Sequence, residues 1–175
     1  AVSNGTAALH LAVAVLNIPA GSEGITSPNT FAASANCMLY NELNPRFADI
    51  DSKTYNIDPE EVSALVSEKT KLIIPVHFAG QAADMQSISK IAKENDLFVI
   101  EDAAHAIGSQ YTDGTYVGNC KYSELTTFSF HPVKTITTGE GGAITTNSKE
   151  FYERLLMLRS HGITKDENKL SMNPG

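Results

Sequence analysis

Hydrophobic residues follow two different spacings along the chain, and these spacings predict helices and strands in turn. Apolar positions three or four residues apart, typical of a helix, occur at 6–17, 31–41, 58–67, 85–92 and a segment beginning after Ser148. Short apolar runs that predict strands occur at 24–27, 45–49, 72–76, 97–100, 124–130 and 142–146. This β-α alternation is typical of a mostly parallel sheet with helices on both faces, so we predict an α/β fold.

The starts of the first two helices carry candidate ligand-binding residues. Gly5 and Thr6 begin the first helix, and free backbone N–H groups and hydroxyls at such a start form a ready anion site. Plain N-capping is the alternative. The second helix is expected to be capped by Asn29-Thr30, with Phe31 at the joint between strand and helix. An aromatic ring there would cover a flat ligand or pack in the core.

Composition narrows the class of protein. The chain has 175 residues, enough for one well-buried domain, with 42% hydrophobic and 19% charged residues. A net charge of -7 and the absence of a Lys/Arg cluster argue against a nucleic-acid binder. Cys37 and Cys120 form no metal-ligand pattern, and no apolar run is long enough to cross a membrane. We therefore expect reduced, buried thiols, no metal and a cytoplasmic location.

The predicted strand at 97–100 leads directly into Glu101-Asp102-Ala103-Ala104-His105. Asp102 thus follows the carboxyl end of a buried strand, where ligands bind in open α/β sheets. A carboxylate there needs a cationic or strongly donating partner, and the protonated ring nitrogen of a pyridine cofactor would be one. His105 would lie over the same ring if the backbone turns helical after Asp102. Alternatively, Asp102 caps a helix and His105 is an ordinary polar residue.

Lys134 stands among few other charges, five residues after Ser129 and just before Gly139-Glu140-Gly141-Gly142. Desolvation disfavours the ammonium form, so a lysine in such surroundings becomes a nucleophilic amine more easily. Lysines of this kind form Schiff bases with carbonyl compounds, of which pyridoxal phosphate is the commonest cofactor. A loop lysine or a simple phosphate contact is the alternative.

The four features together match the parts that a pyridoxal phosphate enzyme needs. The helix start would take the phosphate, and Asp102 would take the ring nitrogen. Phe31 would cover the ring face, and Lys134 would take the aldehyde. We therefore predict pyridoxal 5'-phosphate as the cofactor.

Three runs of the sequence resemble the nucleotide-sugar aminotransferases of the DegT/StrS family, and the resemblance covers the whole chain. These runs are Asn4-Gly5-Thr6-Ala7-Ala8-Leu9, Glu101-Asp102-Ala103-Ala104-His105-Ala106, and Phe128-Ser129-Phe130-His131-Pro132-Val133-Lys134 with Gly139-Glu140-Gly141-Gly142. The resemblance implies the aspartate aminotransferase-like (type I) fold of pyridoxal phosphate enzymes. Residues 1–175 would be a single cofactor-binding large domain, truncated at both ends and lacking the C-terminal small domain.

The resemblance also implies a role for each candidate residue. Lys134 would bind the cofactor covalently and act as general acid and base, Asp102 would contact the pyridine nitrogen, and His105 would lie beside the ring hydroxyl. The remaining cofactor contacts are expected from Gly5, Thr6, Ala7, Ser129 and Phe31. Some relatives replace the lysine by histidine and are dehydratases, so Lys134 favours transamination.

Within the family, 131–142 and Arg159-Ser160-His161-Gly162-Ile163 look most like the transaminase of pseudaminic acid biosynthesis. This likeness implies a UDP-linked 4-keto-6-deoxy-N-acetylhexosamine as substrate and glutamate as amino donor. It also implies a homodimer whose partner subunit completes the site. The polar sequence after Gly162 is expected to be a loop.

Two other functions remain open at this point. One is another type I pyridoxal phosphate enzyme acting on amino acids, such as a lyase or a desulfurase. The other is a non-catalytic nucleotide-sugar binding module, although neither a G-x-G-x-x-G run nor a Walker loop is present to cradle phosphate.

Overall fold

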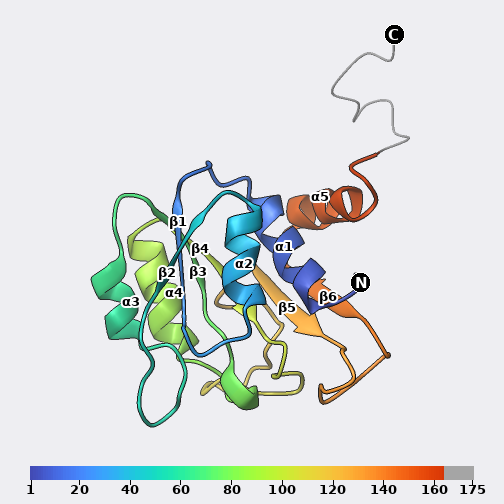
Figure 1. Cartoon of the computed structure of the whole chain (residues 1–175). Coiled ribbons are helices and arrows are strands. Elements are labelled where there is room, and N and C mark those ends of the chain that lie inside the picture. Colours follow the sequence, from blue (N-terminus) through green and yellow to red (C-terminus); the bar gives the residue numbers. More distant parts are fainter. Residues whose placement is uncertain (164–175) are drawn as a thin grey trace.

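A six-stranded sheet forms the centre of the computed structural model, in the order β2-β1-β3-β4-β5-β6 (Figure 1). The first five strands of this order are parallel, and β6 is antiparallel to β5. The strands are β1 Glu23–Thr26, β2 Asn44–Phe47, β3 Thr70–Ile74, β4 Phe98–Asp102, β5 Leu125–Ser129 and β6 Gly142–Thr145. The prediction of a mostly parallel sheet is confirmed.

The structure describes residues 1–163, so the loop predicted after Gly162 lies outside them apart from Ile163. Within this part of the chain, the helices are α1 Gly5–Leu16, α2 Ala33–Tyr40, α3 Pro59–Leu65, the short 3-10 helix η1 Phe78–Gly80, α4 Met85–Glu94 and α5 Lys149–Arg159. Side chains cap all the α-helices except α2, and each cap accepts a backbone N–H of the first turn: Asn4, Asp58, Asp84 and Ser148. None of these helices has the length and apolar character that a membrane crossing requires.

Two expectations about these elements are wrong. Helix α2 begins at Ala33 without a side-chain cap, so Asn29-Thr30 does not start it. The β-α alternation also breaks after β4, because 103–124 contains turns and no helix.

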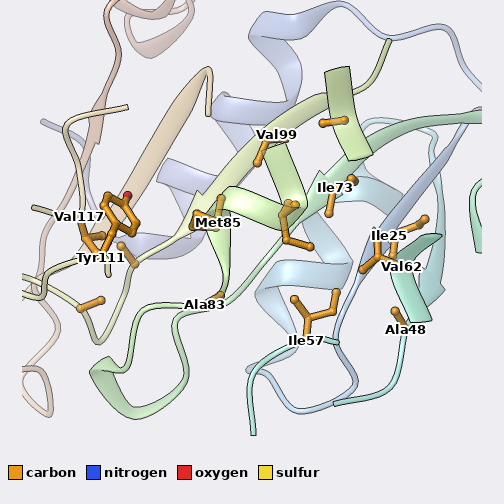
Figure 2. Close-up of a cluster of buried hydrophobic side chains, with 14 of the residues drawn as sticks. Ile25, Ala48, Ile57, Val62, Ile73, Ala83, Met85, Val99, Tyr111 and Val117 are labelled. Atoms are coloured by element: carbon orange, nitrogen blue, oxygen red, sulfur yellow. The ribbon is translucent and has the colours of Figure 1, made fainter. Parts of the chain in front are cut away.

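The pleat of the strands divides the core into two layers. Ile73 and Val99 face α3 and α4, whereas their neighbours Leu72, Ile74 and Ile100 face α1, α2 and α5. Figure 2 shows the first layer, in which Met85 of α4 and Val62 of α3 lie among the strand residues Ile25, Ile73 and Val99. Both thiols, Cys37 and Cys120, are free and buried, as predicted.

The strand order places a crevice at the carboxyl edge of the sheet. After β1 the chain moves outward to β2, and it then returns to the other side of β1 to form β3. Connections leaving the carboxyl ends of β1 and β3 therefore diverge, and such a switch point is where ligands bind in doubly wound sheets. Helix α1 points its first turn toward the same edge, beside β5 and β6.

Two glycines allow α1 to approach the sheet this closely. Val2 and Gly142 exchange backbone hydrogen bonds of 2.9 and 3.0 Å, which pin the chain before α1 to β6. A Cβ on Gly142 would lie 2.5 Å from the carbonyl oxygen of Asn4, and one on Gly5 would lie 2.8 Å from Cβ of Ser129. Any larger residue at either position would push the start of α1 away from β5.

We expect G142A to lower the free energy of unfolding by roughly 1–3 kcal/mol, because the new methyl group would meet backbone that cannot move aside. Urea unfolding followed by circular dichroism measures this change. G21A is the comparison variant, since nothing lies within 4 Å of its added Cβ and any loss of stability there comes from its positive φ of 80° alone. An unfolding free energy for G142A equal to that of the natural protein would contradict the close packing described here.

Candidate functional site

A cavity of about 400 Å³ opens at the carboxyl edge of the sheet, where four separate segments meet. It is bounded by the first turn of α1, the segment between β1 and α2, the end of β4 with the turns that follow, and the loop between β5 and β6. Seven of the eight predicted cofactor-binding residues line it: Gly5, Thr6, Phe31, Asp102, His105, Ser129 and Lys134. The structure thus brings these distant residues together at one cavity, and their roles in cofactor binding stay predictions.

Asp102 is the last residue of β4 and its side chain is 5% exposed, on the sheet face covered by α1 and α2. Its Oδ2 accepts a hydrogen bond of 2.6 Å from the Ser34 hydroxyl, and its Oδ1 accepts the Ala104 N–H at 3.1 Å. Turns, not a helix, follow Asp102, so the alternative that it caps a helix is excluded. With one donor on each oxygen, the carboxylate keeps acceptor capacity toward the cavity.

The charge of Asp102 is felt by its neighbour Cys37, on the buried face of α2. Burial, and after it the nearby Asp102 carboxylate, raise the pKa of the Cys37 thiol to about 12. The thiol therefore stays protonated at neutral pH, and its Sγ–H donates to the Ser34 carbonyl oxygen at 3.3 Å. Cys37 is a packing residue and supplies no nucleophile to the cavity.

Lys134 and His105 meet across the cavity, with 2.8 Å between Nζ and Nε2. Partial burial against the cavity wall, and then the positive charge of Lys134, lower the pKa of His105, while Asp102 acts in the opposite direction. His105 is therefore neutral at pH 7, so its ring nitrogen can accept a hydrogen bond from the Lys134 ammonium. One hydrogen bond therefore joins the two side chains.

Lys134 is carried by a loop that is closed at its base. The N–H of Phe130 donates to the Gly141 carbonyl at 2.8 Å, and the N–H of Thr138 donates to the Phe130 carbonyl at 3.1 Å. A further backbone bond of 2.9 Å runs from Lys134 to the His131 carbonyl. The loop thus presents the amine from a turn fixed to the ends of β5 and β6.

The end of the cavity that is predicted to bind a phosphate is formed by α1 and β5. Gly5 and Thr6 lie in the first turn, where helix N–H groups have no internal acceptors, and Ser129 adds a hydroxyl from the end of β5. Ala7 is the one predicted residue that does not line the cavity, and its N–H donates to the Asn4 side chain at 2.8 Å. Phosphate binding by Ala7 stays a prediction, which would require Asn4 to release that N–H.

Phe31 lies at the cavity mouth with 77% of its surface exposed. Such exposure is unusual for a phenylalanine, and it excludes the alternative that Phe31 packs in the core. An aromatic ring held at the rim can cover a flat group that enters the cavity. Its function as a stacking residue stays a prediction.

Glu101 precedes Asp102 and points to the opposite face of the sheet, where it is fully buried. Its carboxylate accepts bonds from His77 Nε2 at 2.8 Å, from the Tyr111 hydroxyl at 2.5 Å, from Thr126 at 3.2 Å and from Ser123. Because the Ala83 N–H donates to Nδ1 of His77, the Nε2 of that ring carries the proton. Burial alone would raise the pKa of Glu101, but the bonds from His77, Ser123 and Tyr111 lower it below its usual value.

The sequence did not indicate that Ser34 donates to Asp102 or that Thr30 contacts Ser34. Both are small hydroxyl residues in a segment that the sequence pattern identified only as the start of a helix. The available signal was Ser34 itself, a polar residue on the inner face of a helix otherwise lined by Ala33, Cys37 and Met38. Such a residue requires a hydrogen-bond partner inside the protein.

The donor set of the cavity fits pyridoxal phosphate. One end offers helix N–H groups and hydroxyls for a phosphate, the centre offers a buried carboxylate for a ring nitrogen, and the amine of Lys134 can react with an aldehyde. Residues 1–163 contain no group of three or more His, Cys, Asp or Glu side chains that could hold a metal ion.

Comparison with known proteins agrees with this arrangement. The model of the DegT/DnrJ/EryC1/StrS aminotransferase family matches residues 1–175. The chain belongs to this family. It is 44% identical to the GDP-perosamine synthase of Escherichia coli O157:H7 over 162 residues. The aligned region covers 93% of this chain and 44% of that protein.

Solved structures of DegT-family and related aminotransferases share the fold. The aminotransferase from Psychrobacter cryohalolentis has a TM-score of 0.90 and 38% identity, covering 99% of this chain and 44% of its own. PseC of Helicobacter pylori, an aminotransferase of pseudaminic acid biosynthesis, has a TM-score of 0.87 and 36% identity, with coverages of 95% and 44%. NtdA of Bacillus subtilis was solved with its cofactor PMP and has a TM-score of 0.87 and 36% identity, with coverages of 98% and 38%.

These comparisons confirm the type I aminotransferase fold and the family. The chain spans less than half the length of the relatives that it matches. Its assignment as a single large domain without the small domain stays a prediction.

The buried Glu101 carboxylate predicts a pH dependence of stability. Its folded-state pKa lies below the ordinary 4.5, so the folded protein binds fewer protons, and the resulting stabilisation is present above about pH 4.5 and is lost as the pH falls through the folded pKa. We expect E101Q to lower the unfolding free energy at pH 7 by about 1–3 kcal/mol and to flatten its decline in acid. Urea unfolding at several pH values between 7 and 3.5 measures both effects.

E94Q is the control for this experiment, because Glu94 is an exposed residue of α4. It should leave both the unfolding free energy and its pH dependence nearly unchanged. Parallel curves for E101Q and the natural protein would show that Glu101 is not held ionised by its donors.

Proposed function

We propose that this chain is the cofactor-binding part of a pyridoxal phosphate-dependent aminotransferase that acts on a nucleotide sugar. One observation carries the proposal: the amine of Lys134 contacts His105 in a cavity that the Asp102 carboxylate and the start of α1 also line. A binding module would not need a reactive amine among these groups.

When bound, pyridoxal phosphate supplies an aldehyde that carries the amino group and a ring that accepts carbanionic charge. Asp102 holds a proton on the ring nitrogen, because a carboxylate with little access to water favours a cationic partner. Gly5, Thr6 and Ser129 bind the phosphate through backbone N–H groups and hydroxyls. Phe31 covers the ring face and excludes water from it.

Lys134 has two tasks in this proposal. Its amine holds the resting cofactor, and after release it moves a proton at the substrate carbon as general base and then general acid. The 2.8 Å contact with His105 orients the Lys134 side chain in the cavity. The backbone hydrogen bonds that close the loop hold Lys134 at the edge of the cavity.

We further propose that the amino group comes from glutamate and goes to C4 of a UDP-linked 4-keto-6-deoxy-N-acetylhexosamine. The likeness of 131–142 and 159–163 to the transaminase of pseudaminic acid biosynthesis supports this substrate, as does the structural similarity to PseC. The proposal includes a homodimer, since the mouth of the cavity with Phe31 and Val133 is exposed in the single chain. The cytoplasm is its proposed location.

A GDP-linked sugar is the second candidate substrate. The 44% identity to a GDP-perosamine synthase favours it, and this identity is higher than the 36% identity to PseC. The two candidates share the cofactor chemistry of this chain and differ only in the sugar nucleotide.

The cofactor proposal predicts a covalent label on Lys134. Pyridoxal phosphate is added to the protein expressed from its complete reading frame, the mixture is reduced with borohydride, and peptide mass mapping locates the modified residue. We expect Lys134 to carry the label and K134A to lose both the label and the transaminase activity. K93A, which removes the exposed Lys93 of α4, should be labelled like the natural protein.

A label on other lysines and none on Lys134 would refute the cofactor proposal. Retention of tight sugar-nucleotide binding by K134A, without any label in the natural protein, would favour the binding module. Consumption of cysteine in preference to glutamate by the labelled enzyme would favour a desulfurase.

The substrate proposal predicts which sugar consumes glutamate. UDP-linked and GDP-linked 4-keto-6-deoxy sugars are offered separately with glutamate, and 2-oxoglutarate is measured. We expect at least tenfold faster turnover with the UDP-linked N-acetylhexosamine, a preference of about 1.4 kcal/mol in transition-state binding. Faster turnover of the GDP-linked sugar would replace the first candidate by the second and leave the cofactor proposal intact.

A further inference from the structure

Two hydroxyl groups and one carboxylate form a line beside the cavity. The Oγ1 of Thr30 lies 2.7 Å from Oγ of Ser34, and that Oγ lies 2.6 Å from Oδ2 of Asp102. Ser34 is completely buried on α2, whereas Thr30 borders the cavity. The line therefore begins at Thr30 on the cavity wall, passes through the buried Ser34 and ends on Asp102.

The direction of these hydrogen bonds follows from the chemistry of the groups. A carboxylate has no proton to donate, so Ser34 donates to Asp102. Ser34 has only one hydroxyl proton, so Thr30 must donate to Ser34. The other acceptor near Ser34, the carbonyl of Phe31, lies farther away at 3.4 Å. Both donors thus point toward the carboxylate.

The carboxylate is fixed from two sides by this arrangement. Ser34 holds Oδ2 from α2, and the Ala104 N–H holds Oδ1 from the turn after β4. Rotation of the carboxylate would break both bonds in a site that water hardly reaches. A donor already polarised by Thr30 also stabilises the negative charge more strongly than an isolated hydroxyl would.

We propose that Ser34 and Thr30 are positioning residues, which orient Asp102 and stabilise its charge so that a shared proton stays on the ring nitrogen of the cofactor. This inference rests on the proposed function. The two residues lie in the segment that also carries Phe31, so one short stretch places both the aromatic ring and the support of the carboxylate. Neither residue touches the reacting atoms.

The test uses pyridoxal phosphate labelled with ¹⁵N at the ring nitrogen, bound to the full-length protein. In S34A the carboxylate loses one of its two donors, so we expect the ¹⁵N resonance to move toward the position of the unprotonated ring. The dissociation constant of the cofactor should rise on the order of tenfold, because a hydrogen bond to a charged group is lost. Absorbance titration of the apoprotein with pyridoxal phosphate measures this constant.

Variants of Thr30 test the same line without disturbing the core. T30V removes the outer donor, so we expect a smaller ¹⁵N shift in the same direction and a roughly twofold to threefold weaker affinity. T30S keeps the hydroxyl and should restore both values. S89A is the matched control, since Ser89 is a buried serine of α4 on the other face of the sheet.

The outcomes separate this inference from the proposed function. If S34A and T30V keep the natural ¹⁵N position and affinity while Lys134 is still labelled, the positioning role is wrong and the cofactor proposal stands. If S34A does not fold, the pair T30V and T30S decides the question. Equal ¹⁵N shifts in S89A and T30V would show a general structural effect and would also overturn the inference.

Discussion

Two adjacent carboxylates, Glu101 and Asp102, are buried at the end of β4, and each needs hydrogen-bond donors because water cannot solvate it there. The pleat of the strand sends them to opposite faces of the sheet, so each must find its donors in a different layer of the protein. The segments around the cavity supply many of those donors. The position of Asp102 depends on the donors of both carboxylates, because the two residues are adjacent in β4.

The donors of Glu101 come from several distant segments. His77 follows β3, Tyr111 and Ser123 belong to the long stretch between β4 and β5, and Thr126 lies in β5. Residues 103–124, between β4 and β5, contain no helix, and these hydrogen bonds join the segments to the end of β4 instead. On the other face, Asp102 has fewer donors and keeps access to the cavity. One carboxylate is thus satisfied within the protein, and the other retains capacity for a ligand.

The sequence predicted the features that depend on local pattern. Apolar spacing identified the strands and the helices, and the position of Asp102 and Ser129 after strands placed them at one edge of the sheet. The start of α2 and the missing helix at 103–124 were not predictable in this way, because both depend on tertiary contacts. The partners of Glu101 and the relation of Ser34 to Asp102 were also hidden, since they join residues far apart in sequence. Ala7 shows the opposite case, in which a local capping bond occupies an N–H that the family pattern assigned to phosphate.

The loop that carries Lys134 contacts the opposite wall of the cavity through the hydrogen bond between Lys134 and His105. A molecule that fills the cavity from Lys134 to α1 would contact all four chain segments that line it. Its binding free energy would then add to the folding free energy of the whole domain. The protein would be more resistant to heat and proteolysis when loaded, so the cellular supply of cofactor would help to set how long each molecule survives.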